Sequence, residues 1–160
     1  MGFMDSPHLH HPKTLNNETS TQFMPRYEVF TTDPIDPDIK QQLATEITEI
    51  HCAVTGAPPS FVRVVFVAVG KDNCFVAGER RHDASIRGTI REGRSHESVA
   101  ELLHGLSSAF HRAVGIPEEQ ILISLGARPG WQIMEGGRVL PEAGDEDDWL
   151  EAGKQEKAEA

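Results

Sequence analysis

The 160-residue sequence predicts an α+β domain in which two consecutive β-α-β units form a four-stranded sheet backed by two helices. Two observations lead to this fold class. Short runs of β-branched residues have strand character, and two longer segments repeat apolar residues at helical spacing. Strand, helix and strand follow one another in this order twice. Because the crossover of a β-α-β unit is right-handed, each unit is expected to contribute a parallel pair of strands.

The first unit begins with a short strand expected over residues 27–31. Residues 36–38 (Asp-Pro-Asp) then supply an N-cap, a proline at the first helical position and an acid in the first turn. Gly56 is expected to end this helix. Residues 61–69 are nearly continuous in apolar, β-branched side chains, which predicts a strand covered on both faces. The helix has its apolar residues three or four positions apart: Ile39, Leu43, Ile47, Ile50 and Val54.

The second unit begins with residues 85–91, where apolar and polar side chains alternate with strand periodicity. A helix is expected from about Ser95 to Gly115, because Gly115 and the proline two residues later are stop signals. Residues 121–125 form the closing strand. The helix has an apolar face made by Val99, Leu102, Leu103, Leu106, Phe110, Ala113 and Val114.

The two ends of the chain differ in composition from its middle. Residues 1–24 lack a periodic apolar pattern and are expected to form a disordered arm, because they cannot offset the entropy of ordering. Residues 151–160 are expected to be a disordered acidic tail. The folded domain is therefore predicted over residues 25–150. Three histidines of the arm, His8, His10 and His11, suggest a metal site, but no carboxylate or thiol lies at ligand spacing, which favours solvated side chains.

Composition also excludes several functions. The formal net charge of −10 argues against binding to nucleic acid or an anionic membrane, which needs clustered Lys and Arg. The longest apolar run, residues 64–69, is far shorter than the roughly 20 residues of a membrane span. Cys52 and Cys74 are too few for a disulfide framework, so a reduced, cytoplasmic setting is expected. With no phosphate-binding loop, metal set or cofactor motif in the sequence, we expect no cofactor. The charge balance points to a small-molecule or protein partner.

Arg91 and Arg94 lie where a predicted strand ends and a helix begins. Two guanidinium groups beside unpaired helix N–H groups make a site for a carboxylate, although both could instead pair with surface acids. His51 lies at the edge of the first helix's apolar stripe, where a partly buried structural histidine is the alternative to a catalytic one. Glu135, between Trp131 and a Gly-Gly pair, is either a functional acid or a solvated one.

Pro25 stands directly before the first predicted strand and follows Met24. If translation begins at Met24, or if the arm is removed, Pro25 carries a free secondary amine whose basicity near neutral pH suits a general base. With the arm attached, its nitrogen is a tertiary amide, which is neither base nor nucleophile.

Together these motifs resemble the cis-3-chloroacrylic acid dehalogenase group of the tautomerase superfamily over about residues 25–150. The motifs that carry the resemblance are Met24-Pro25-Arg26-Tyr27, the helix with His51 and Thr55-Gly56, Arg91-Glu92-Gly93-Arg94-Ser95, Met134-Glu135-Gly136-Gly137-Arg138, Leu140-Pro141 and Trp149. The resemblance implies a trimer with a proline at the mouth of each site. It implies that Pro25 is the general acid/base and that Arg91 and Arg94 bind a substrate carboxylate.

The resemblance further implies that His51 helps to hold the carboxylate and that Glu135 activates water. Ser124 stands where this group has a tyrosine, which argues against dehalogenation by hydration. The expected activity is proton transfer between enol and keto forms, or water addition, on a small unsaturated or 2-oxo carboxylate. The alternatives are a proline-independent lyase or hydratase of a specialised biosynthetic route, and a non-catalytic trimeric protein that keeps the anion pocket.

Overall fold

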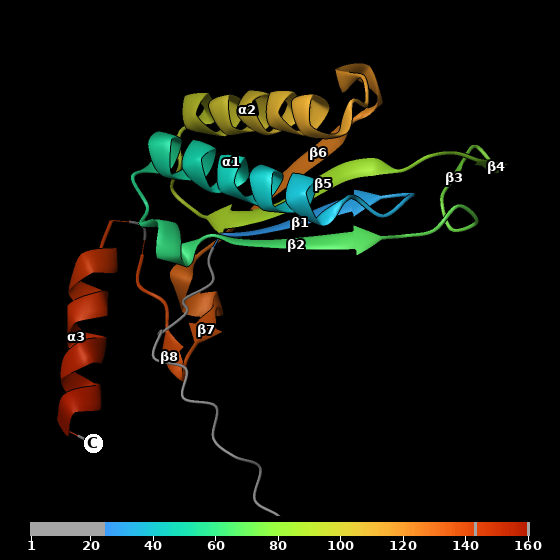
Figure 1. Ribbon diagram of the computed structural model, residues 1–160. Helices are drawn as coiled ribbons and strands as arrows, with labels where there is room; N and C mark the ends of the chain where they lie inside the picture. Colours follow the sequence, from blue (N-terminus) through green and yellow to red (C-terminus); the bar gives the residue numbers. More distant parts are fainter. Residues whose placement is uncertain (1–24, 143, 160) are drawn as a thin grey trace, which may run out of the picture.

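Residues 25–142 and 144–159 are described by the computed structural model, so the arm expected over residues 1–24 lies outside the described part (Figure 1). A four-stranded sheet has the order β2-β1-β5-β6, and two long helices cover one of its faces. The sheet strands are β1 (Arg26–Thr31), β2 (Arg63–Ala68), β5 (Ala84–Arg91) and β6 (Leu122–Arg128). The helices are α1 (Pro37–Thr55), α2 (His96–Val114) and α3 (Glu146–Glu159).

Smaller elements connect these. Two hairpins lie outside the main sheet: β3 (Phe75–Val76) with β4 (Glu79–Arg80), and β7 (Met134–Glu135) with β8 (Arg138–Val139). Three single-turn 3-10 helices are η1 (Pro59–Phe61), η2 (Glu118–Gln120) and η3 (Gly130–Gln132). The hairpin of β3 and β4 extends beyond one end of the sheet, and the hairpin of β7 and β8 lies near the other end (Figure 1).

The strand pairing confirms the two predicted β-α-β units and shows how they join. Strands β1 and β2 are parallel, as are β5 and β6, as right-handed crossovers require. The central pair, β1 with β5, is antiparallel and places Arg26 opposite Thr89. The first residues of β1 therefore lie beside the last residues of β5, which is where the candidate site forms.

Both long helices begin and end where their capping residues predict. The Asp36 carboxylate accepts a hydrogen bond from the Asp38 N–H at 2.9 Å, and Gly56 ends α1 in the left-handed conformation. The Ser95 hydroxyl accepts from the Ser98 N–H at 3.2 Å at the start of α2, and Gly115 ends that helix in the same way. Among the described residues, no helix is long and apolar enough to cross a membrane.

The core lies between the sheet and the inner faces of α1 and α2. Its buried members are Tyr27, Val29, Ile35, Leu43, Ile47, Ala84, Ile86, Ile90, Leu102, Leu106, Ala109 and Phe110. Fully burying one such large aliphatic side chain stabilises the fold by about 1.5–3 kcal/mol. Gly88 of β5 lets Tyr27 and Leu125 approach the sheet backbone, because a Cβ there would lie 2.4 Å from Leu125 Cδ2.

The expectation that residues 61–69 form a strand covered on both faces is wrong for the protomer. Strand β2 is shorter and lies at the sheet edge, and its face turned away from the helices is open. Val67 on that face is 36% exposed. A continuous apolar run marks residues that avoid water, but it does not say whether the cover comes from the same chain.

The expectation of a disordered tail over residues 151–160 is also wrong where the chain is described, since α3 continues to Glu159. Arg138 of β8 anchors this helix: its guanidinium lies 4.3 Å from the Trp149 ring centroid, and its Nη1 donates to the Trp149 carbonyl at 2.8 Å. Trp149 Nε1 in turn donates to the Val139 carbonyl at 2.8 Å. These polar contacts order a helix that has little apolar surface to bury.

We predict that Gly88→Ala destabilises the protein by about 1–3 kcal/mol, because the added methyl group overpacks the space between Tyr27 and Leu125. The measurement is the free energy of unfolding from urea titration. Gly126→Ala is the matched control on β6, since a Cβ there meets only the Gly88 carbonyl oxygen at 3.9 Å. Equal stability of the two variants would contradict this account of the core.

Candidate active site

Pro25 stands at the end of the sheet where β1 begins. It is fully buried, and its carbonyl accepts a hydrogen bond from the Arg63 N–H at 2.9 Å. The antiparallel register of β1 with β5 continues from the pair Arg26 and Thr89, so Pro25 lies beside the end of β5. Pro25, the predicted base, and Arg91, the first predicted arginine, therefore lie at the same end of the sheet.

Arg91, the last residue of β5, is only 4% exposed. Its Nη1 donates to the Pro141 carbonyl, while Nε and Nη2 are buried and have no hydrogen-bond partner among the described residues. Burial lowers the pKa of Arg91, and the nearby carboxylates of Glu146 and Glu142 act in the opposite direction. Buried charged donors without an acceptor are costly, so this guanidinium is suited to receive an anion.

Arg94 follows in the loop between β5 and α2, where Gly93 adopts a φ of 91°. Its Nη1 donates to the Thr55 carbonyl at the end of α1, at 3.0 Å. A cavity of about 280 Å³ lies beside it. The cavity is lined by Thr55, Gly56, Ala57, Pro58, Gly93, Arg94, Gly144, Glu146 and Asp147. Arg94 thus lines a small cavity, whereas Arg91 is buried at the end of β5 and is not among the residues that line it.

His51 lies on the inner face of α1 and is 2% exposed. Its Nδ1 is 2.7 Å from the Tyr27 hydroxyl oxygen, and the two rings meet edge to face with centroids 5.8 Å apart. Tyr27 is therefore part of the site, although the sequence analysis did not propose it. The available signal was the alternation of β1, which turns Tyr27 into the core, where a buried hydroxyl needs a partner.

Electrostatics keep both members of this pair neutral at pH 7. Burial lowers the pKa of His51 to about 4, and the positive charge of Arg94 acts in the same direction. Burial also raises the pKa of Tyr27, and the Cys52 thiol adds to that rise. A neutral His51 can form hydrogen bonds but carries no positive charge.

The remaining two predicted residues differ in position. Glu135 forms part of β7, opposite Arg138, and its charge acts on Arg91. Ser124 of β6 pairs in register with Arg87, on the sheet face turned away from the helices. The protomer therefore gathers Pro25, His51, Arg91, Arg94 and Glu135 at one end, and it leaves Ser124 apart from them.

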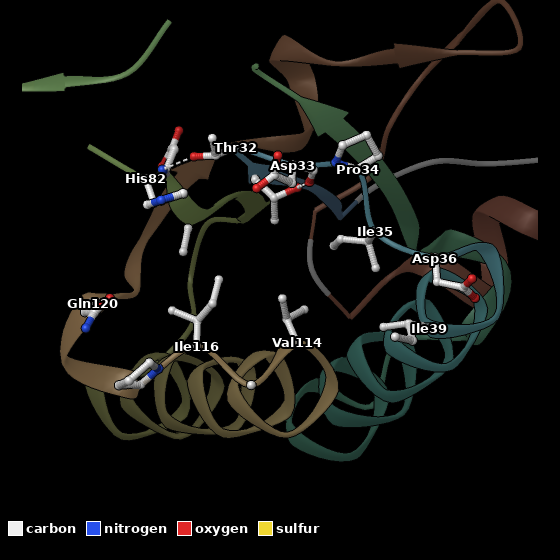
Figure 2. Close-up of a pocket in the computed structure, with 15 residues that line it drawn as sticks. Thr32, Asp33, Pro34, Ile35, Asp36, Ile39, His82, Val114, Ile116 and Gln120 are labelled. Carbon is white, nitrogen blue, oxygen red and sulfur yellow. Dashed lines mark hydrogen bonds between the residues drawn. The ribbon is translucent and has the colours of Figure 1, made fainter. Parts of the chain in front are cut away.

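A larger cavity, of about 500 Å³, lies at the opposite end of the sheet (Figure 2). Ile35, Val114 and Ile116 point into it from the start of α1 and the end of α2. It is lined by the carboxylates of Asp33, Asp36 and Asp83, and no arginine or lysine is among the described lining residues. The pair of arginines is absent here, so this cavity is a poor match for a carboxylate.

The fold and the paired arginines together indicate a protein of the tautomerase type. The model of the family described as "Putative oxalocrotonate tautomerase enzyme" matches residues 24–154, and the chain belongs to this family within the tautomerase superfamily. No functionally curated protein matches the sequence.

Solved structures agree with this assignment. The chain is similar to N1, a member of the cis-3-chloroacrylic acid dehalogenase family, with a TM-score of 0.75 and 25% identity over 84% of this chain and 99% of that one. It is 31% identical to native Ps01740, with a TM-score of 0.67 over 69% of this chain and 99% of that one. A fused 4-OT asymmetric trimer, 19% identical, shares the fold with a TM-score of 0.68 over 71% of this chain and 94% of that one.

We predict that the His51 ring titrates with a midpoint near pH 4 in the folded protein, well below its ordinary pKa of 6.5. Arg94→Gln should raise this midpoint, because it removes a neighbouring positive charge, whereas Arg87→Gln on the other sheet face should not. The measurement is an NMR titration of the ring protons.

The same shift fixes the sign of a stability change. As the pH falls below about 6.5, the unfolded chain binds a proton at His51 before the folded protein does. The free energy of unfolding should therefore decrease between about pH 6.5 and pH 4, by at most about 1.4 kcal/mol per pH unit from this group. A ring midpoint near 6.5 would contradict the buried position of His51.

Proposed function

We propose that this protein is an enzyme of the tautomerase superfamily that moves a proton between enol and keto forms of a small unsaturated or 2-oxo carboxylate, or adds water to one. The observation that carries the proposal is Arg91, which is nine-tenths buried and has two guanidinium N–H groups without a partner among the described residues. A carboxylate is the acceptor that suits guanidinium N–H donors of this kind. Arg94 supplies a second positive charge nearby.

In the tautomerisation, the substrate carboxylate binds to Arg91 and Arg94, and the neutral His51 adds a hydrogen bond. The amine of a free Pro25 accepts the proton of the enol hydroxyl and donates a proton to the substrate carbon, so that one proton moves from oxygen to carbon and the amine is regenerated. Negative charge that develops on the oxygen is stabilised by the fixed positive charge of the arginines. Water addition would use Glu135 to orient and deprotonate the water.

A second candidate is a carboxylate-binding member that does not use the proline. In the 160-residue chain Pro25 follows Met24, so its nitrogen is an amide and cannot transfer a proton. The anion pocket would remain in such a protein, but the proton transfer would pass to Glu135 or would be lost.

We also propose a trimer, like the fused 4-OT asymmetric trimer whose fold this chain shares. The open face of the sheet supports this, since it carries apolar side chains such as Val67 and the 70% exposed Leu122. Ser124 lies on the same open face, so it could contact a substrate only in the site of a neighbouring subunit. A role for Ser124 in binding therefore depends on the assembly.

We predict that protein with a free Pro25 amine converts phenylenolpyruvate to its keto form. The rate is measured from the change in absorbance. Arg91→Ala should lower kcat/KM by at least about tenfold, because it removes one or more charge-assisted hydrogen bonds worth about 1.5–3 kcal/mol each. Pro25→Ala should lower kcat more than KM. Arg112→Ala is the control, since Arg112 pairs with Glu46 on the outer helix surface. Unchanged rates in both Arg91→Ala and Pro25→Ala would remove the site assignment.

The state of Pro25 decides between the two candidates. We predict that protein from its native source has an intact mass and an N-terminal sequence that begin at Pro25. An N-terminus upstream of Pro25 on all molecules would exclude the free-amine mechanism and favour the proline-independent protein. Engineered chains that begin at Pro25 and at Met1, assayed side by side, separate these outcomes by activity.

A further inference from the structure

The first turn of α3 lies against the candidate carboxylate site. Glu146 and Asp147 line the same cavity as Arg94, and Glu146 also acts electrostatically on Arg91. The Glu146 carboxylate accepts a hydrogen bond from the Gly144 N–H at 2.7 Å, which holds it at the start of the helix. One wall of this cavity therefore carries the carboxylates of Glu146 and Asp147, while Arg94 in the same cavity attracts anions.

Arg138 holds α3, the helix that carries Glu146 and Asp147, in place. Besides its contacts with Trp149, Arg138 Nε lies 3.1 Å from a Glu156 carboxylate oxygen. Gly153 leaves room for the guanidinium, because a Cβ at this position would clash with Arg138 Nη1. A stacked cation, a backbone hydrogen bond, an ion pair and a glycine therefore anchor one side of α3 to the hairpin of β7 and β8.

The balance of charge follows from these placements. Arg91 and Arg94 are the guanidinium groups of the site, and their surroundings contain four carboxylates, those of Glu135, Glu142, Glu146 and Asp147. One substrate carboxylate can bind to the unpartnered N–H groups of Arg91. A second carboxylate of the same substrate that extended into the cavity beside Arg94 would meet Glu146 and Asp147. Like charges at short range repel strongly when they are shielded from water.

We propose that the first turn of α3 is a specificity element that admits substrates with one carboxylate and rejects dicarboxylates, with Glu146 and Asp147 as the determining residues. The proposal rests on the proposed function of the Arg91 and Arg94 site and adds the substrate class. Oxalocrotonate, named in the family's description, has two carboxylates, so this chain is expected to differ from that description in what it accepts. The preferred end group opposite the carboxylate is neutral or a hydrogen-bond donor.

The experiment compares two ligands that differ in one end group. Fumarate has two carboxylates, and in monomethyl fumarate one of them is replaced by a neutral methyl ester. Dissociation constants come from calorimetry at low salt with the chain that begins at Pro25 and with the full-length chain. Wild-type protein should bind monomethyl fumarate at least tenfold more tightly than fumarate. The preference should shrink at high salt, because screening weakens the repulsion of the second carboxylate.

The variants Glu146→Gln and Asp147→Asn should each reduce the preference about threefold to fivefold, mainly through tighter binding of fumarate. Asp148→Asn is the matched control: it removes the same charge from the same helical turn, but Asp148 does not line the cavity. It should leave the preference unchanged. Arg138→Met, which removes the contacts that anchor α3, should reduce the preference without touching either carboxylate.

The outcomes separate the two proposals. If wild-type protein binds both ligands equally, or if Glu146→Gln and Asp147→Asn change the preference no more than Asp148→Asn, the specificity proposal is overturned while the carboxylate site stands. If neither ligand binds, or if Arg91→Ala binds them as tightly as the wild type, the proposed function itself is overturned and the specificity proposal with it. Circular dichroism and thermal midpoints equal to the wild type show that each variant is folded.

Discussion

The antiparallel pairing of β1 with β5 is the constraint on which the rest of this structure depends. Each β-α-β unit by itself would bring only its own strand ends together. The antiparallel pairing joins the two units. Because Arg26 lies opposite Thr89, the start of β1 lies beside the end of β5. The end of α1 and the start of α2 meet at the same end of the sheet, so residues far apart in sequence converge there. The two arginines of the site come from the last residue of β5 and from the loop that links β5 to α2.

A second interaction joins β1 to α1 close to this convergence. The hydrogen bond of Tyr27 to His51 fastens β1 to α1 inside the core, next to the arginines. A buried hydroxyl and a buried imidazole each need a partner, and here they satisfy one another at 2.7 Å. Because both groups stay neutral, the charge of the site is set by the arginines and by the surrounding carboxylates alone.

Much of the fold could be predicted from the sequence, because local rules determine it. Caps such as Asp36 and Gly56 placed the helix ends, apolar spacing identified the helix faces, and the handedness of the crossovers gave the parallel pairs. The site residues were found through spacing and resemblance. Local patterns do not specify which strands become neighbours across units, and so the antiparallel central pair and the partnership of Tyr27 with His51 needed the three-dimensional structure.

The two wrong expectations have a common origin: each treated apolar content as the measure of order. Strand β2 is rich in apolar residues, yet it lies at an edge with an open face. Residues 151–159 are poor in apolar residues, yet they are helical because Arg138 satisfies Trp149 and Glu156 through polar contacts. The composition of a segment indicates how strongly it avoids water. It does not indicate whether a residue elsewhere in the chain, such as Arg138, holds that segment in place through polar contacts.

The anchoring of α3 has a consequence for how such a protein can change over generations. The buried core cluster contains no residue of this helix among those described, so substitutions along α3 carry little cost in folding. The strands and helices that hold the arginines are bound together by close packing and tolerate far less. A lineage could therefore replace or recharge this appended helix and acquire a new preference for substrates, while its catalytic scaffold stays the same.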